Sequence, residues 1–262
     1  MKRLTDVTFW NDQWWAGQRP ARLRLYRDFD WETVRLLARL VGSQPARVLE
    51  IGAGGSRVLP FLRHRHGYEV CGTDFALTGC RLLRANLALV GEDGLVICED
   101  LFHSSLPAGR FDLVYSSGLI EHFEDTRAVI AEHVRLVRPG GKLVLIVPNL
   151  EGLEGKVMQR LAPPLWARHR VFGPRELVEH LQALGLKATH SGYLGSFFFY
   201  VGTGPEWSIP QRWPAWWRHL IHQSVRLFNG IVSFAFRLSP IRPHTRTFST
   251  AFYAAGTKPP AP

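Results

Sequence analysis

A short apolar strand runs into a glycine turn at Arg47-Val-Leu-Glu-Ile-Gly-Ala-Gly-Gly-Ser56. Within the turn, Gly52 and Gly54 let the backbone approach a ligand at points where a Cβ would block it. The residues that follow, 57–66, read as a helix, so the free N–H groups of a helix N-terminus face the same place. A strand, a glycine turn and a helix in this order predict the nucleotide crevice of an open α/β sheet.

The turn lacks one glycine of the dinucleotide-binding pattern. G-x-G-x-x-G requires glycine where this chain has Arg57, so a pyrophosphate-binding turn is disfavoured. Glu50 at the strand end, followed by Gly52 and Gly54, resembles E-x-G-x-G-x-G, the first motif of class I S-adenosylmethionine (SAM) dependent methyltransferases. The chain departs from that motif at Ser56, where the family has its last glycine. The resemblance implies SAM as the cofactor.

Acidic residues also end the next two predicted strands. The second strand, residues 68–74, ends in Asp74, about twenty residues after the glycine turn, where a carboxylate can accept both hydrogen bonds of a ribose diol. The third, residues 95–101, ends in Asp100 and Leu101, which the resemblance places beside the adenine. A lone Asp after a strand is usually a helix cap or a solvated loop residue. Three acids at successive strand ends instead predict one ligand site, because ligands of open α/β sheets bind there.

The resemblance implies a set of cofactor-binding residues, which follow the ends of the first four strands. They are Glu50, Gly52, Ala53, Gly54, Asp74, Phe75, Asp100, Leu101 and Ser116.

His122 is the candidate catalytic residue, in Gly118-Leu-Ile-Glu-His-Phe123. It titrates near neutrality, and in this family the loop after the fourth strand borders the transferred methyl group. The alternative is a histidine that caps a helix or packs in the core. No metal site is expected, because the quinone-precursor O-methyltransferases that share the Glu-His pair bind metal with an acid at the position of Gly118. Cyclopropane fatty acid synthases share Glu-His-Phe and also use an N-terminal cysteine, but the first cysteine here is Cys71.

Alternating strands and helices predict an α/β fold with one doubly wound, Rossmann-like sheet. The resemblance implies seven strands, the seventh antiparallel. The later strands are expected at residues 111–117, after Pro139-Gly-Gly141, at 187–193 and at 248–255, with a helix at 174–184. The chain divides into an aromatic and helical N-terminal extension (1–45), a SAM-binding core (46–193), a helical insertion between strands six and seven (194–246), and the last strand with the tail (247–262).

Composition allows a sizeable core and argues against a nucleic-acid substrate. The chain has 262 residues, 46% of them hydrophobic, and a formal net charge of +10. Nucleic acid is one reason for such a charge, but the lysines and arginines are spread along the chain with few runs. The fourth strand ends in Ser116-Ser-Gly-Leu119, unlike the Asn/Asp-Pro-Pro-Tyr signature of amine-directed nucleic-acid methyltransferases.

A reducing compartment is expected from the cysteines. Cys71, Cys80 and Cys98 are odd in number and fall on predicted strands or a helix, which predicts buried thiols. The N-terminus lacks the apolar run of a signal peptide, and no charge-free stretch approaches the roughly 20 residues of a membrane span. The expectation is a cytoplasmic protein, soluble or peripherally bound to membrane, of undetermined oligomeric state.

The insertion at residues 194–246 is far longer than loops usually are, and it holds a predicted helix from Pro214 to Leu238. One side of that helix is a polar stripe: Arg218, His222, Arg226, Asn229, Ser233 and Arg237. The opposite side is apolar: Trp213, Trp217, Leu220, Leu227, Ile231 and Phe234. Such a helix is typical of a membrane interface, but a substrate lid, a dimer contact or packing on its own domain fits as well.

We therefore expect a SAM-dependent methyltransferase that acts on a small acceptor, hydrophobic or linked to a lipid or sugar, with O-methylation favoured over C- or N-methylation. The alternative is a non-catalytic protein of the same fold that docks on membrane or a partner through the aromatic insertion.

Overall fold

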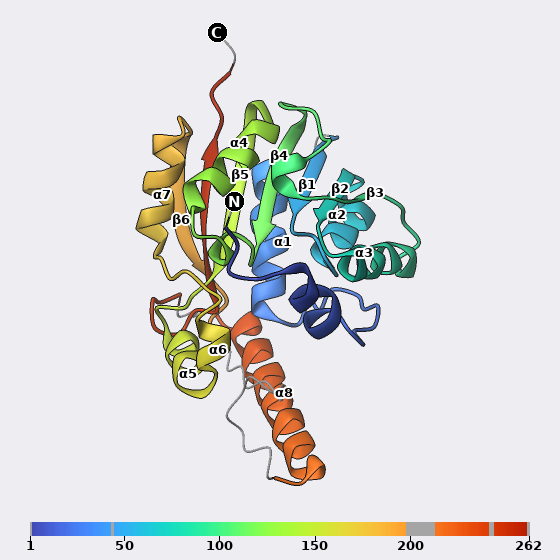
Figure 1. The fold of residues 1–262 in the computed structure, drawn as a ribbon, viewed down its shortest axis with the longest axis vertical. Helices are drawn as coiled ribbons and strands as arrows, with labels where there is room; N and C mark the ends of the chain where they lie inside the picture. Colours follow the sequence, from blue (N-terminus) through green and yellow to red (C-terminus); the bar gives the residue numbers. More distant parts are fainter. Residues whose placement is uncertain (1, 43–44, 198–212, 241–243, 261–262) are drawn as a thin grey trace.

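A computed structural model describes residues 2–42, 45–197, 213–240 and 244–260. Its strands form a 7-stranded sheet in the order β3-β2-β1-β4-β5-β7-β6 (Figure 1). Strand β7 is antiparallel to both of its neighbours, and the other pairings are parallel. The predicted fold class is therefore confirmed. The strands are β1 Arg47–Ile51, β2 Glu69–Asp74, β3 Leu95–Cys98, β4 Phe111–Ser117, β5 Val137–Pro148, β6 Lys187–Leu194 and β7 Ala251–Thr257.

Helices cover both faces of the sheet (Figure 1). They are α1 Asp28–Val41, α2 Val58–His66, α3 Leu77–Leu89, α4 Thr126–Leu136, α5 Leu153–Leu161, α6 Pro163–Trp166, α7 Pro174–Ala183 and α8 Ala215–Leu238. Helices α1, α2 and α3 pack on one face, where Val48 of β1 is fully buried. Helices α4 and α7 pack on the other face, where the next residue, Leu49, is fully buried. Alternation along a strand thus divides the core into two layers.

Three strand boundaries differ by three or more residues from those expected. Strand β3 ends at Cys98, and Asp100 follows it as the cap of a 3₁₀ turn, where its side chain accepts from the backbone N–H of Phe102. Strand β5 starts at Val137, directly after α4, and Pro139-Gly-Gly141 lies within it as a bulge between the pairings of Phe111 and Leu113. Strand β7 starts at Ala251 rather than at residue 248, because residues 245–249 close a turn in which the backbone N–H of Ser249 donates to the Thr245 carbonyl at 3.0 Å.

The N-terminal segment crosses the carboxyl edge of the sheet before α1 begins (Figure 1). Phe9–Trp14 forms a π-helical turn. Arg3 pairs with Phe123 as an isolated antiparallel bridge, and the backbone N–H of Leu4 donates to the His122 carbonyl at 2.8 Å. The segment is thereby fixed over the strand ends where the site was expected.

Helix α8 projects away from the sheet and contacts α1 (Figure 1). It starts within one residue of the predicted position. Residues 198–212 of the insertion, including Trp207, lie outside the described residues. Among the helices that are described, none is long and apolar enough to cross a membrane.

Candidate functional site

A cavity of about 1120 Å³ opens at the carboxyl ends of β1, β2 and β4, beneath the N-terminal segment and α8. Small-molecule sites usually measure roughly 300–1,000 Å³, so this cavity has room for two ligands side by side. Its lining includes six of the predicted cofactor residues: Glu50, Gly52, Gly54, Asp74, Phe75 and Leu101. His122 lines the same cavity, so the candidate base and the strand-end acids share one site.

The glycine turn is shaped by two different requirements. Gly52 has a φ of +72°, the left-handed conformation that favours glycine. Gly54 is needed for close approach, because a Cβ there would lie 2.7 Å from Oδ2 of Asp74. Its backbone N–H instead donates to that oxygen at 2.7 Å. Asp74 also accepts from the backbone N–H of Ala76 at 2.8 Å, so one carboxylate joins the turn to the end of β2.

Glu50 is held by hydroxyl groups at the end of β1. Its Oε2 accepts hydrogen bonds from Tyr115 at 2.6 Å and from Ser56 at 2.5 Å. Burial raises the pKa of Glu50 to about 7, although both hydroxyls act in the opposite direction. Burial likewise raises the pKa of Asp74, against the backbone N–H groups that favour its charged form. A cationic ligand in the cavity would favour ionisation of both acids.

Asp100 forms an ion pair with Arg3, near the N-terminus of the chain. The Arg3 guanidinium lies 2.6 Å from Oδ1 of Asp100 and 4.7 Å from the centre of the Phe75 ring. It also lies 5.5 Å from the Phe123 ring. Hydrogen bonds and the charge of Arg3 lower the pKa of Asp100 despite some burial. Arg3 thus contacts Asp100, which the resemblance places beside the adenine, and Phe75, another of the predicted cofactor-binding residues.

The candidate base is held in one tautomer. Nδ1 of His122 lies 2.9 Å from the Arg168 carbonyl, which can only accept, so we assign the proton to Nδ1 and the lone pair to Nε2. Nε2 lies 3.9 Å from Oε1 of Glu121. Burial is the main cause that lowers the pKa of His122, to about 3, and the nearby His169 adds to it. The imidazole is therefore neutral at ordinary pH, and the expectation that it titrates near neutrality is wrong because burial disfavours its charged form. It becomes an effective base only where an anion, such as an ionised Glu121 3.9 Å away, stabilises the imidazolium.

Glu121 is 1% exposed, and neither of its carboxyl oxygens has a hydrogen-bond partner. Burial raises its pKa to about 8. Glu154 of α5 lines the cavity as well; its Oε2 lacks a partner, and burial raises its pKa to about 8. Buried carboxyls without partners are costly, so this wall of the cavity contains acceptors that a ligand can satisfy.

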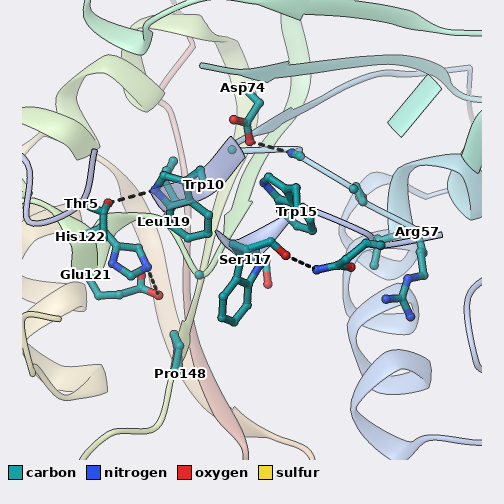
Figure 2. A pocket seen from close by; sticks show the side chains of 18 of the residues that line it. Thr5, Trp10, Trp15, Arg57, Asp74, Ser117, Leu119, Glu121, His122 and Pro148 are labelled. Atoms are coloured by element: carbon teal, nitrogen blue, oxygen red, sulfur yellow. Dashed lines mark hydrogen bonds and ion pairs between the residues drawn. The ribbon is translucent and has the colours of Figure 1, made fainter. Parts of the chain in front are cut away.

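Tryptophans of the N-terminal segment close the cavity. The Trp10 and His122 rings are perpendicular, with their centres 5.2 Å apart, and Nε1 of Trp10 donates to the Thr5 hydroxyl at 3.0 Å. Trp15 lies against the glycine turn, and its buried Nε1 has no partner. Figure 2 shows both indoles between His122 on one side and Arg57 on the other. Aromatic faces suit a cation such as a sulfonium.

Three predicted residues lie away from the lining. Ala53 and Ser116 are buried behind it, at 0% and 1% exposure, because they point into the core from the turn and from β4. Asp100 is turned toward Arg3, outside the lining. The expectation of three buried thiols is wrong for Cys98, which is exposed on the edge strand β3. In the described part of the chain, no group of three His, Cys, Asp or Glu side chains is arranged to hold a metal.

Sequence reasoning missed Arg3, Glu154 and the closeness of Trp15 to the glycine turn. The cluster of aromatic residues near the N-terminus was the available signal for Trp15. Arg3 and Glu154 gave none, because each reaches the cavity only through the path of its segment.

The residues present fit an adenosyl sulfonium. Gly54 lets the Asp74 carboxylate and the Trp15 indole lie against the turn. The carboxylates at the ends of β1 and β2 suit a positive charge and a diol, and Phe75 and Leu101 are apolar faces for a base. The unpartnered donor on Trp15 and the acceptors on Glu121 lie in the same lining.

Comparison with known proteins agrees with this geometry. A methyltransferase domain model matches residues 49–145. The chain is 28% identical over 188 residues to 27-O-demethylrifamycin SV methyltransferase of Amycolatopsis mediterranei, a match that covers 67% of this chain and 66% of that protein. It is 29% identical over 191 residues to a ubiquinone biosynthesis O-methyltransferase of Xanthomonas euvesicatoria, covering 67% and 76% of the two chains.

Solved structures share the fold at lower identity. Phosphoethanolamine N-methyltransferase 2 of Haemonchus contortus, in complex with SAM, superposes with a TM-score of 0.57 at 17% identity, covering 97% of this chain and 57% of that one.

Proposed function

Since this chain belongs to the class I SAM-dependent methyltransferases, we propose that it methylates an oxygen atom of a small acceptor, one that is hydrophobic or linked to a lipid or sugar. The observation that carries this proposal is the neutral His122, whose Nε2 lone pair lies in the cavity that holds the strand-end acids. Hydroxyl acceptors of high pKa need a base, whereas many other nucleophiles do not.

When bound, SAM would supply a methyl group on a positively charged sulfur. The nucleophile attacks the methyl carbon in line with the carbon–sulfur bond. We assign cofactor binding to Glu50, Gly52, Gly54 and Asp74, with Phe75 and Leu101 beside the adenine. The tryptophans above them would exclude water, and attack would require the acceptor oxygen within roughly 3–3.5 Å of the methyl carbon.

His122 and Glu121 handle the proton. As the acceptor oxygen bonded to the methyl carbon, the carbon–sulfur bond would break and S-adenosylhomocysteine would leave. The hydroxyl proton would pass to Nε2 of His122, 3.9 Å from the Glu121 carboxyl. The pair then holds one proton more than before. Release of the Glu121 proton leaves a carboxylate beside the imidazolium, which stabilises it.

The relatives support transfer to oxygen. The Amycolatopsis and Xanthomonas proteins are named as methyltransferases of an O-demethyl compound and of ubiquinone biosynthesis, respectively. We assign residues 46–193 to the catalytic core. The insertion at residues 194–246 is assigned to a lid over the acceptor or a membrane contact.

We also propose that α8 rests on a lipid surface. Its outward side exposes Trp216 at 62%, Leu227 at 66% and Ile231 at 61%, while its inward side lines the cavity with His222 and Arg226. A helix with exposed tryptophans on a chain of net charge +10 suits an anionic bilayer. Continuity between this surface and the cavity would let an acceptor enter from lipid.

The test of O-methylation uses SAM with a tritiated methyl group and a panel of phenols, hydroxylated sugars and polyprenyl-linked sugars. We expect label on a hydroxyl, and His122→Gln to lower turnover about 100-fold or more with S-adenosylhomocysteine (SAH) binding retained. His133→Gln is the matched control, since His133 is equally buried and bonds the Val129 carbonyl through Nδ1 at 2.8 Å, but lies outside the cavity. Label on amines alone, or full turnover by His122→Gln, would contradict the proposal.

A further inference from the structure

One region of the cavity plays no part in the chemistry above. It is formed by the segment before α1, the first turn of α1, the start of α2, and α8, and we name it the arginine region. Its charged lining residues are Arg24, Arg27, Asp30, Arg57, His222 and Arg226. Four guanidinium groups therefore share this part of the lining with a single carboxylate.

Helix α8 is held firmly against this region. Ser233 donates to Oδ1 of Asp28 at 2.6 Å and accepts from its backbone N–H at 2.9 Å. One turn later, Nε of Arg237 donates to the Leu25 carbonyl at 2.9 Å. Arg226 precedes Ser233 by two turns and lies on the same side of the helix. The side of α8 that bonds the segment before α1 thus also contributes Arg226 to the cavity that Arg24 and Arg27 line.

Arginines outnumber acids in the lining of the arginine region, where Asp30 is the one carboxylate among the described residues. Burial lowers the pKa of Arg57, and the charges of Arg24 and Arg27 lower it further against the attraction of Asp30. Burial raises the pKa of Asp30, with three arginines acting in the opposite direction. Arg24, Arg27 and Arg57 are partly buried like charges, which is unfavourable, whereas Arg226 is exposed. A bound anion would relieve that cost.

We infer that the arginine region binds a phosphoryl group carried by the methyl acceptor. The guanidinium fork matches phosphate oxygens in pairs, and a dianion supplies the negative charge that one carboxylate does not. His122 and Arg57 lie on opposite sides of the site in Figure 2, with Trp15 between them. An acceptor that places its hydroxyl at His122 thus extends its phosphate away from the transferred methyl. This inference rests on the proposed function.

The experiment measures binding of inorganic phosphate by the full chain, saturated with SAH, in a buffer of weakly binding anions. We expect Arg57→Gln and Arg226→Gln each to weaken phosphate binding at least about fivefold, with SAH affinity unchanged within about twofold. Arg175→Gln is the matched control, because it removes the same charge from a side chain on α7 that is 93% exposed and lies outside the cavity.

Two results would overturn the inference. Equal phosphate affinity in all four proteins would mean that the arginine region does not bind it. A tenfold loss of SAH affinity in Arg57→Gln would assign the arginines to the carboxylate of the cofactor instead. His122→Gln separates this inference from the proposed function, since it should lose turnover and keep phosphate binding.

A lipid and a soluble source of the phosphate are then told apart. Flotation with phosphatidylcholine vesicles, with and without phosphatidic acid, is compared between the wild type and Arg57→Gln. Loss of the phosphatidic acid effect in Arg57→Gln, but not in Arg175→Gln, identifies a lipid phosphate. An equal effect in all three, with the expected loss of inorganic phosphate binding, identifies a soluble phosphorylated acceptor.

Discussion

Ser56 replaces the last glycine of the family motif, and its hydroxyl gives the substitution a structural role. It donates to Glu50 at 2.5 Å and accepts from the backbone N–H of Leu59 at 3.2 Å. One side chain thus orients the acid at the end of β1 and caps the first turn of α2. Serine in place of glycine therefore helps to fix the Glu50 carboxylate. With glycine at this position, Tyr115 would be the one hydroxyl that donates to Glu50.

We propose that adenine binding would draw Asp100 away from Arg3, whose guanidinium also lies over the Phe75 ring. We predict that Arg3→Ala binds SAH about threefold more tightly, or better, because the adenine no longer has to displace a partly buried ion pair. Calorimetric titration measures the change. Lys2→Ala is the control, since it removes the neighbouring cation, which pairs with Glu124 in solvent. Weaker binding by Arg3→Ala would instead mean that the guanidinium stacks on the adenine.

Buried Glu121 makes stability depend on pH. Its pKa is raised from 4.5 to about 8 in the folded protein, so below pH 4.5 it is neutral whether the chain is folded or unfolded. As pH rises toward 8, only the unfolded chain gains by ionising, and the folded state loses relative stability. We predict that Glu121→Gln gains at least about 1 kcal/mol over the wild type between pH 5 and pH 8, or about 2–4 °C in Tm. A pH-independent Tm difference would show that Glu121 is already ionised at pH 5.

Strand-end acids could be foreseen from the sequence, but their partners could not. Glu50 and Asp74 follow apolar strands, and parallel strands bring their carboxyl ends together. The Arg3 contact with Asp100 depends on how the first residues cross the sheet, for which no periodic pattern exists. The tautomer of His122 likewise depends on Arg168, which reaches it through a separate segment.

At the scale of elements, α8 has its polar side toward the protein and its apolar side toward solvent. Asn229 and Ser233 are buried, whereas Leu227 and Ile231 are exposed. The 3.6-residue period correctly indicated two sides but not which one meets the body of the protein. That choice follows from buried Asp28, whose carboxylate needs a donor and obtains it from Ser233.

The outward side of α8 predicts lipid binding. Leu227→Glu and Ile231→Glu should each lower flotation with anionic vesicles several-fold, since each places a charge in the apolar contact. Leu95→Glu is the control: Leu95 is 55% exposed, on β3, remote from α8 in Figure 1. SAH binding should stay unchanged in all three. Equal flotation of all variants would refute the membrane contact.

Across the whole molecule, folding sorts charges that the sequence scatters. Acids at the ends of β1 and β2 gather at one part of the cavity, and arginines far apart in the chain gather at another. Net charge alone suggested a polyanionic partner, whereas the folded chain concentrates positive charge within the cavity of the methyltransferase itself. The N-terminal segment, the strand ends, the region of α5 and α6, and α8 all contribute to this cavity.

The central claim is that carboxylates at the strand ends hold the adenosyl group of the cofactor. Calorimetric titration of SAH into the wild type, Asp74→Ala and Asp93→Ala tests it directly; Asp93 is the control because its side chain is 95% exposed. We predict that Asp74→Ala binds SAH at least about tenfold more weakly, the equivalent of about 1.4 kcal/mol, and that Asp93→Ala matches the wild type. Unchanged affinity in Asp74→Ala, or no binding to the wild type at millimolar SAH, would contradict the claim.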